Sequence, residues 1–186
     1  MKDSPLKFQG IKLVPILSLG LSQIYLSEEK IKNVAEWFDP GDMTAFAPLP
    51  VHDFGNGRLT LTDGHTRAYV ACRAGVGQIP VIYDTDGIIT SEDGQTLYKN
   101  DIAWCERFGL YSIRDLENRI LDGADYKRLW DRRCDLGYNL LINTAGHRRK
   151  KWESLHPELY LFGVDEDGEK LYYENTAGDI FTFDAV

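Results

Sequence analysis

Residues 63–67 have the sequence Asp-Gly-His-Thr-Arg, which joins anion-binding side chains to a glycine turn. The preceding residues 59–62, Leu-Thr-Leu-Thr, alternate as a strand with one buried face does. Residues 65–74 have the composition of a helix, and Gly75 is placed to end it. A strand that enters a helix through a glycine turn presents unpaired backbone N–H groups at one point. That point favours a phosphate or a carboxylate.

Each residue of this turn has a candidate role. The candidate phosphate- or nucleotide-binding residues are Gly64, His65, Thr66 and Arg67, and the candidate catalytic residues are Asp63 and His65. Arg67 adds guanidinium donors, and its charge in the first helical turn opposes the helix dipole unless an anion lies nearby. In the structural alternative Asp63 only braces the turn, His65 and Thr66 cap the helix, and Arg67 pairs with one of 29 acidic residues.

The pattern around this turn resembles the signature of the ParB/sulfiredoxin superfamily. That signature is a Gly-x-x-Arg turn entering a short helix, followed by alanines, a glycine and an Ile-Pro-Val strand. The matching residues are 63–67, the alanines at 68 and 71, Gly75, and Ile-Pro-Val at 79–81.

Segments upstream of the turn resemble the same superfamily, so that the resemblance covers about residues 11–84. They are an apolar strand at 14–17, a helix at 28–38 and Pro-Leu-Pro-Val at 48–51. The resemblance implies an α+β fold, with a ParB/sulfiredoxin-like small mixed sheet and packed helices. It implies fold more strongly than activity, because one fold hosts several chemistries.

Branches of the superfamily imply different activities for this chain. Sulfiredoxin-type repair requires a cysteine where this chain has His65, and the nearest thiol is Cys72, so we do not expect that activity. ParB-type DNA clamping is also not expected, because the chain is acidic. A third branch contains kinases that resemble the ADP-dependent serine kinase, whose turn is Asp-Gly-His-His-Arg. Residues 63–67 differ from that turn by one substitution.

The kinase-like branch implies phosphoryl transfer from a nucleotide, with ATP, ADP or CTP and Mg²⁺ as the expected cofactors. Such chemistry needs N–H groups and cations on the phosphates and a carboxylate near the acceptor hydroxyl. Asp63 would orient a metal or the acceptor. Glu28 or Glu29 lies near the region from which related kinases take a base, although charges that stabilise the start of a helix are the preferred interpretation.

Two functions from different classes remain open. In the first, the protein binds a nucleotide or a small phosphorylated ligand at residues 63–67 and acts as a small-molecule phosphotransferase. In the second, it is a non-catalytic protein-binding module or adaptor in which this turn is structural. A homodimer is compatible with either.

Composition excludes several classes. The net charge of −8 opposes general duplex-DNA binding, and the basic run at 147–151 is typical of a solvated surface. We find no apolar run near the ~20 residues of a membrane span and no signal peptide, and we expect a cytoplasmic protein. The three cysteines lack Cys-x-x-Cys spacing, which predicts free buried thiols and neither a disulfide nor a metal site.

The pattern of elements predicts a ParB/sulfiredoxin-like domain over 1–90 and, over 91–186, a helical extension with a C-terminal β-hairpin or meander. We expect Ser112 and Asp115 to form a capping box, and residues 143–156 to be turn-like. The other predicted elements are a hairpin at 49–62, helices at 95–108, 113–120 and 124–136 with core aromatics, and strands at 159–164, 170–174 and 180–183.

Overall fold

The computed structural model describes residues 6–185 and divides the chain into two compact units, with the boundary between Tyr126 and Lys127. We call them the N-terminal unit and the C-terminal unit. The sequence places this boundary after residue 90. The difference arises from α4 (Glu92–Arg107), which packs into the N-terminal unit, where the Tyr98 hydroxyl donates to the Thr62 carbonyl at 3.1 Å.

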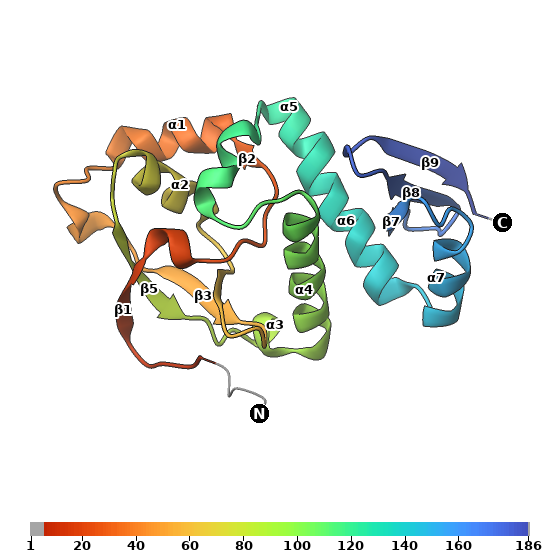
Figure 1. Cartoon of the computed structure of the whole chain (residues 1–186), viewed down its shortest axis with the longest axis horizontal. Helices are drawn as coiled ribbons and strands as arrows, with labels where there is room; N and C mark the ends of the chain where they lie inside the picture. The colour runs from red at the N-terminus through yellow and green to blue at the C-terminus, as the bar shows by residue number, and fades with distance from the viewer. Residues whose placement is uncertain (1–5, 186) are drawn as a thin grey trace. The chain divides into compact units, whose positions relative to one another are not determined.

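The N-terminal unit is built on a mixed four-stranded sheet with the order β1-β5-β3-β4 (Figure 1). β5 is antiparallel to β1 and parallel to β3, and β3 is antiparallel to β4. The residues of β5 alternate between a buried and a more exposed face, whereas the last three residues of β3 are all buried. The strands are β1 (Ile11–Pro15), β3 (Leu49–Asp53), β4 (Leu59–Leu61) and β5 (Gln78–Tyr83).

The predicted hairpin at 49–62 is confirmed as β3 and β4, and its loop is held by Asp53. The Asp53 Oδ1 accepts hydrogen bonds from the backbone N–H groups of Gly55 at 2.9 Å and Gly57 at 3.1 Å. Both glycines have a positive φ, a backbone conformation that residues with a side chain rarely adopt. The register of the hairpin therefore fixes the position of the turn at residue 63, which follows β4.

Two helices pack side by side next to this sheet, α1 (Glu28–Trp37) and α2 (His65–Arg73) (Figure 1). Ser27 caps α1, with its Oγ accepting from the Lys30 N–H at 3.3 Å. The helix predicted at 28–38 is therefore present, but none of its residues is fully buried. Its apolar residues are only partly covered because α1 contacts α2 and leaves its remaining surface open.

The chain after the sheet forms short elements that the sequence does not resolve. α3 (Gly87–Thr90) directly precedes α4, ahead of the helix that the sequence predicts at 95–108. The capping box is confirmed, with Asp115 Oδ2 accepting from the Ser112 N–H at 2.7 Å, but it opens a 3-10 helix over Ile113–Asn118. β6 (Ile120–Leu121) then pairs in parallel with β2 (Leu26–Ser27). Further short helical segments are the 3-10 turns Ile16–Ser18 and Met43–Ala45 and helix α5 (Gly123–Tyr126).

The C-terminal unit begins with helical turns of unusual width. A π-helical turn over Lys127–Asp131 leads into α6 (Arg132–Tyr138), and a second π turn follows over Asn139–Asn143. The next helix, α7 (Gly146–Glu153), lies where the sequence favours a turn. The prediction of a turn there is wrong because Trp152, only 1% exposed, anchors a largely polar helix to the core.

The predicted meander is confirmed as the antiparallel sheet β7-β8-β9, so the α+β class holds for the described residues. The strands are β7 (Tyr160–Val164), β8 (Lys170–Glu174) and β9 (Ile180–Asp184).

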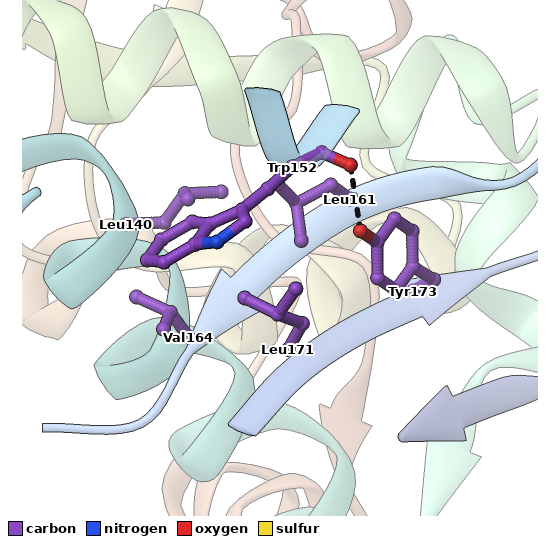
Figure 2. Close-up of a cluster of buried hydrophobic side chains, with 6 residues drawn as sticks. All are labelled: Leu140, Trp152, Leu161, Val164, Leu171 and Tyr173. Atoms are coloured by element: carbon purple, nitrogen blue, oxygen red, sulfur yellow. Dashed lines mark hydrogen bonds between the residues drawn. The ribbon is translucent and has the colours of Figure 1, made fainter. Parts of the chain in front are cut away.

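One face of the meander carries the core of the C-terminal unit, which Figure 2 shows. The Tyr173 hydroxyl donates to the Trp152 carbonyl at 2.7 Å within this core. The assignment of the aromatics of the predicted helix at 124–136 to the core is confirmed for Tyr126 and Trp130, which are both buried. The core side chains are Leu140, Trp152, Leu161, Val164, Leu171 and Tyr173.

The burial predicted for the three thiols is confirmed for Cys105 only. Cys72, Cys105 and Cys134 are all free, with Cys105 buried and the other two half-buried. In the part of the chain that is described, every helix is too short or too polar to traverse a bilayer.

Candidate functional site

A pocket of about 380 Å³ lies in the N-terminal unit at the start of α2. Its volume falls within the range of roughly 300–1,000 Å³ that small-molecule sites occupy. The residues of the predicted turn line one side of it, and residues of α1 line the other. The lining consists of Gln23, Lys30, Asn33, Val34, Trp37, Asp63, Gly64, His65, Thr66 and Arg67.

The start of α2 presents main-chain donors to this pocket. Gly64 is the N-cap, no side chain caps the helix, and its first turn holds no acidic residue. Within residues 6–185, no hydrogen bond engages the N–H groups of His65, Thr66 or Arg67. These donors and the positive end of the helix dipole favour negative charge at the start of α2.

Gly64 is required at the turn for two reasons. Its φ is +81°, in the left-handed region that side chains disfavour. A Cβ at this position would also lie 2.7 Å from Leu49 Cδ2 and 3.0 Å from Arg67 Nη2. The close approach of Arg67 to the turn therefore depends on the missing side chain.

Arg67 lies along the edge of the pocket with its side chain 23% exposed. Its Nη1 donates to the Ala47 carbonyl at 3.0 Å, and its guanidinium lies 5.9 Å from the centre of the Phe46 ring. Its Nη2 is 4.0 Å from the Asp63 carboxylate, a contact too long for a hydrogen bond. The guanidinium is thus held beside the turn with donors remaining for a ligand.

Asp63 stands at the mouth of the pocket with its side chain 83% exposed. Among the hydrogen bonds of the described residues, its carboxylate accepts none, so the bracing role considered for it from the sequence has no counterpart there. Its ion pair with Arg67 is long and solvated, which makes it worth little. The carboxylate is available to a ligand, a metal ion or an acceptor hydroxyl.

His65 is buried, with 3% of its surface exposed. Its Nε2 accepts a hydrogen bond from the Ser22 backbone N–H at 3.1 Å. Burial lowers the pKa of His65 to about 4, against a smaller opposing effect of the Asp63 charge. The ring is therefore neutral at pH 7, with its proton on Nδ1. This geometry favours a positioning role, tying residue 22 to the turn, over the catalytic role expected from the sequence.

The α1 side of the pocket is the part that sequence reasoning missed. Lys30, Asn33, Val34 and Trp37 follow the i, i+3, i+4, i+7 spacing that brings residues to one helix face. Trp37 is 44% exposed, a large apolar surface left open beside the pocket. The sequence does place a lysine, an asparagine and a tryptophan at the spacing that puts them on one face of a helix.

The glutamates considered as a catalytic base do not line this pocket. Glu28 pairs with Lys32 at 3.0 Å on the exposed side of α1, and both Glu28 and Glu29 lie in its first turn. This placement fits charges that stabilise the start of a helix. Within residues 6–185, no group of three or more His, Cys, Asp or Glu side chains is arranged to hold a metal ion.

Comparison with known proteins adds little to this geometry. No protein-family model matches the chain, and no curated protein matches it. The chain is similar to the crystal structure of protein Atu1540 from Agrobacterium tumefaciens, with 17% sequence identity and a TM-score of 0.41 over 85% of this chain and 82% of that chain. A similarity at this level carries no argument about function.

Proposed function

We propose that the N-terminal unit binds a nucleotide or another small phosphorylated ligand in the pocket at the start of α2. The observation that carries this proposal is that the uncapped first turn of α2 opens into a pocket of about 380 Å³ that Arg67 and Lys30 also line. Asp63 is the acidic residue of the lining, and it lies at the mouth. We place this activity in the cytoplasm.

The phosphate lies against the helix start in this proposal. The N–H groups of His65, Thr66 and Arg67 donate to its oxygens, and the Arg67 guanidinium adds charge-assisted bonds. Lys30 approaches from α1, where its Nζ is 4.9 Å from the centre of the Tyr126 ring. Cations on both sides of the pocket suit a ligand with more than one negative charge.

The body of the ligand lies along α1. The half-exposed indole of Trp37 offers a flat surface for a base, and Val34 continues this apolar surface. Stacking of a base on an aromatic side chain contributes about 1–3 kcal/mol. The indole is the reason to favour a nucleotide over inorganic phosphate.

Phosphoryl transfer is the activity that we propose for the bound nucleotide. The acceptor hydroxyl attacks the terminal phosphorus, the bond to the leaving nucleotide oxygen breaks, and Asp63 takes the proton. Asp63 would hold a Mg²⁺ ion brought by the nucleotide only in place of this role, because a carboxylate bound to a metal ion is a poor base. The resemblance to the ParB/sulfiredoxin superfamily and its kinase-like branch supports this step.

One observation favours the alternative, a protein-binding module. Ile11 and Leu13 of β1 are 63% and 65% exposed, and Ile82, the cross-strand partner of Ile11, is 43% exposed. These side chains share one face of the sheet, where a partner protein or a second copy would cover them. Sedimentation of the wild type and of an Ile11→Ser/Leu13→Ser variant measures whether this face mediates association.

A thermal-shift panel tests the nucleotide proposal. ATP, ADP, CTP and phosphate are each added with and without Mg²⁺, and a ligand at 100 times its Kd stabilises the folded chain by about 2.7 kcal/mol. We expect Arg67→Met to weaken nucleotide binding about 10- to 100-fold, because a hydrogen bond to a charged group contributes about 1.5–3 kcal/mol.

Matched variants separate the site from general charge effects. Lys30→Met should weaken nucleotide binding, whereas Lys32→Met, on the same helix outside the pocket, should not. Trp37→Ala should weaken binding of a nucleotide more than binding of phosphate. If none of the anions stabilises the wild type, the nucleotide proposal is rejected.

A further inference from the structure

One nitrogen of the buried His65 ring is not used by the fold. Nε2 accepts a hydrogen bond from the Ser22 backbone N–H at 3.1 Å, so the neutral ring carries its proton on Nδ1. Within residues 6–185, no hydrogen bond engages this Nδ1–H group. A buried side chain seldom leaves a donor unpaired, because the missing bond is costly unless water or a ligand supplies it.

The unpaired donor of His65 opens to the pocket at the start of α2. The residue is 3% exposed, and this pocket is the open space that it lines. Nδ1 lacks a partner but is not a fully buried atom, so the ring reaches the open space at this nitrogen. The Nδ1–H group is therefore available to a ligand in the pocket.

The His65 ring is held in place before a ligand arrives. Ser22, whose N–H binds Nε2, is itself fixed because its Oγ donates to the Leu61 carbonyl at 2.8 Å. His65 is also the first residue of α2, whose first turn supplies the main-chain N–H groups of the site. Nδ1–H is therefore a preorganised donor next to these N–H groups, and a ligand gains its hydrogen bond without the cost of ordering the ring.

Thr66 supplies a second side-chain donor to the same pocket. It lines the pocket from the first turn of α2, and its hydroxyl forms no hydrogen bond within the described part of the chain. The hydroxyl and Nδ1–H add to the main-chain N–H groups of residues 65–67 and to the Arg67 guanidinium. So many donors in one place require an acceptor with several oxygens.

The donors at the start of α2 distinguish between two kinds of phosphate. A terminal phosphate group carries three free acceptor oxygens and a charge of about −1.5 to −2 at pH 7. A phosphate that is esterified on both sides has one free oxygen fewer and a single charge. The set of donors, together with the cations Arg67 and Lys30 in the lining, matches the terminal group better.

We infer that the pocket takes a terminal phosphate group, of a phosphomonoester or at the end of a nucleotide chain, and that the His65 Nδ1–H helps to select it. The inference rests on the proposed function and specifies which phosphate of the ligand lies against α2. His65 then serves the site through both ring nitrogens, because Nε2 holds the ring to Ser22 and Nδ1–H donates to a phosphate oxygen. The terminal group is also the one that phosphoryl transfer moves.

Calorimetric titration of the full chain compares ADP and ATP with their terminal methyl esters. Each ester shares base, ribose and phosphate chain with its parent and differs only in blocking one oxygen of the last phosphate. We expect at least one parent nucleotide to bind about tenfold or more tightly than its ester. Equal binding within both pairs, or no binding of either parent, would overturn the inference. The proposed function is rejected only if no anion of the thermal-shift panel binds.

Two substitutions separate the two nitrogens of His65. His65→Gln supplies an oxygen where Nε2 accepts from the Ser22 N–H but removes Nδ1–H, whereas His65→Asn places its amide near the position of Nδ1 and loses the Ser22 contact. We expect His65→Gln to weaken binding of the preferred nucleotide about tenfold and to reduce its preference over the ester. His65→Asn should lose more stability and retain more of that preference.

The imidazole nitrogens report the contact directly. In ¹⁵N spectra of the labelled chain, the saturating nucleotide should move the Nδ1 signal of His65 more than the Nε2 signal. The inference is overturned if the Nδ1 signal stays in place, or if folded His65→Gln binds the nucleotide and its ester as the wild type does. In both cases, binding of the nucleotide by the wild type would still support the proposed function.

Discussion

Replacement of Glu174 by glutamine is expected to lower the free energy of unfolding by about 3–5 kcal/mol. The carboxylate oxygens of Glu174 accept from Nη1 and Nη2 of Arg133 at 3.0 and 2.8 Å, and the two side chains are 0% and 5% exposed. Glutamine keeps the shape but removes the counter-charge of a buried guanidinium, which is the costly change. Urea denaturation at pH 7 measures the effect.

Two further variants test whether the loss of stability comes from the buried ion pair. Arg133→Met/Glu174→Leu should recover most of the loss, because an apolar pair of similar volume removes the buried charges together. Glu153→Gln, which removes an exposed partner of Arg149, should change stability by about 1 kcal/mol or less. Equal losses for Glu174→Gln and Glu153→Gln would show that the buried pair has no special role.

Acidification from pH 7 to pH 4 is expected to destabilise the N-terminal unit through His65. The pKa of His65 is lowered from 6.5 to about 4 by burial, so between these pH values the unfolded chain binds a proton that the folded chain does not. Stability therefore falls as the pH falls through this interval and loses no more below pH 4 from this group. The loss is on the order of 3 kcal/mol, at about 1.4 kcal/mol per pH unit.

The contribution of His65 is isolated by a variant that does not titrate. His65→Gln supplies an amide oxygen where Nε2 accepts from the Ser22 N–H. Carboxylates also titrate in this range, but they do so in both proteins. The difference in free energy of unfolding between wild type and variant should fall as the pH is lowered from 6.5 to 4. Parallel stability curves would contradict a buried neutral histidine.

Much of the N-terminal unit was predictable because its signals are local. The alternation at 59–62, the glycine turn and the helix after it depend on neighbouring residues, and they appear as β4 and α2. The capping box at Ser112 is local in the same way. β2 and β6 form by pairing with each other across a long stretch of sequence, and each is only two residues long. A strand of two residues is too short to show alternation in the sequence.

The boundary between the units and the course of the chain after residue 84 were harder to predict for the same reason. α4 belongs to the N-terminal unit through contacts such as the hydrogen bond from the Tyr98 hydroxyl to the Thr62 carbonyl. Such a contact cannot be predicted from neighbouring residues in the sequence. α7 has little apolar periodicity and is held chiefly by Trp152. Tertiary packing overrode weak local preference in both cases.

The same contrast between local sequence signals and tertiary contacts applies to the candidate site residues. The residues of the turn at 63–67 were found because one continuous motif contains them. The α1 residues opposite them were not assigned to the site, because the sequence analysis gave residues 28–38 only as a helix, and the structure leaves α1 without a buried residue. In the C-terminal unit, the contact between Arg132 and the Tyr172 hydroxyl likewise arises only through folding.

The proposed function depends on phosphate binding by the main-chain N–H groups at the start of α2. Titration of the ¹⁵N-labelled chain with ADP, read through the backbone amide signals of His65, Thr66 and Arg67, tests this binding. We expect these signals and that of the Trp37 indole to move together and saturate, and Arg67→Met to weaken the response. Saturating ADP that leaves all three amide signals in place would contradict it.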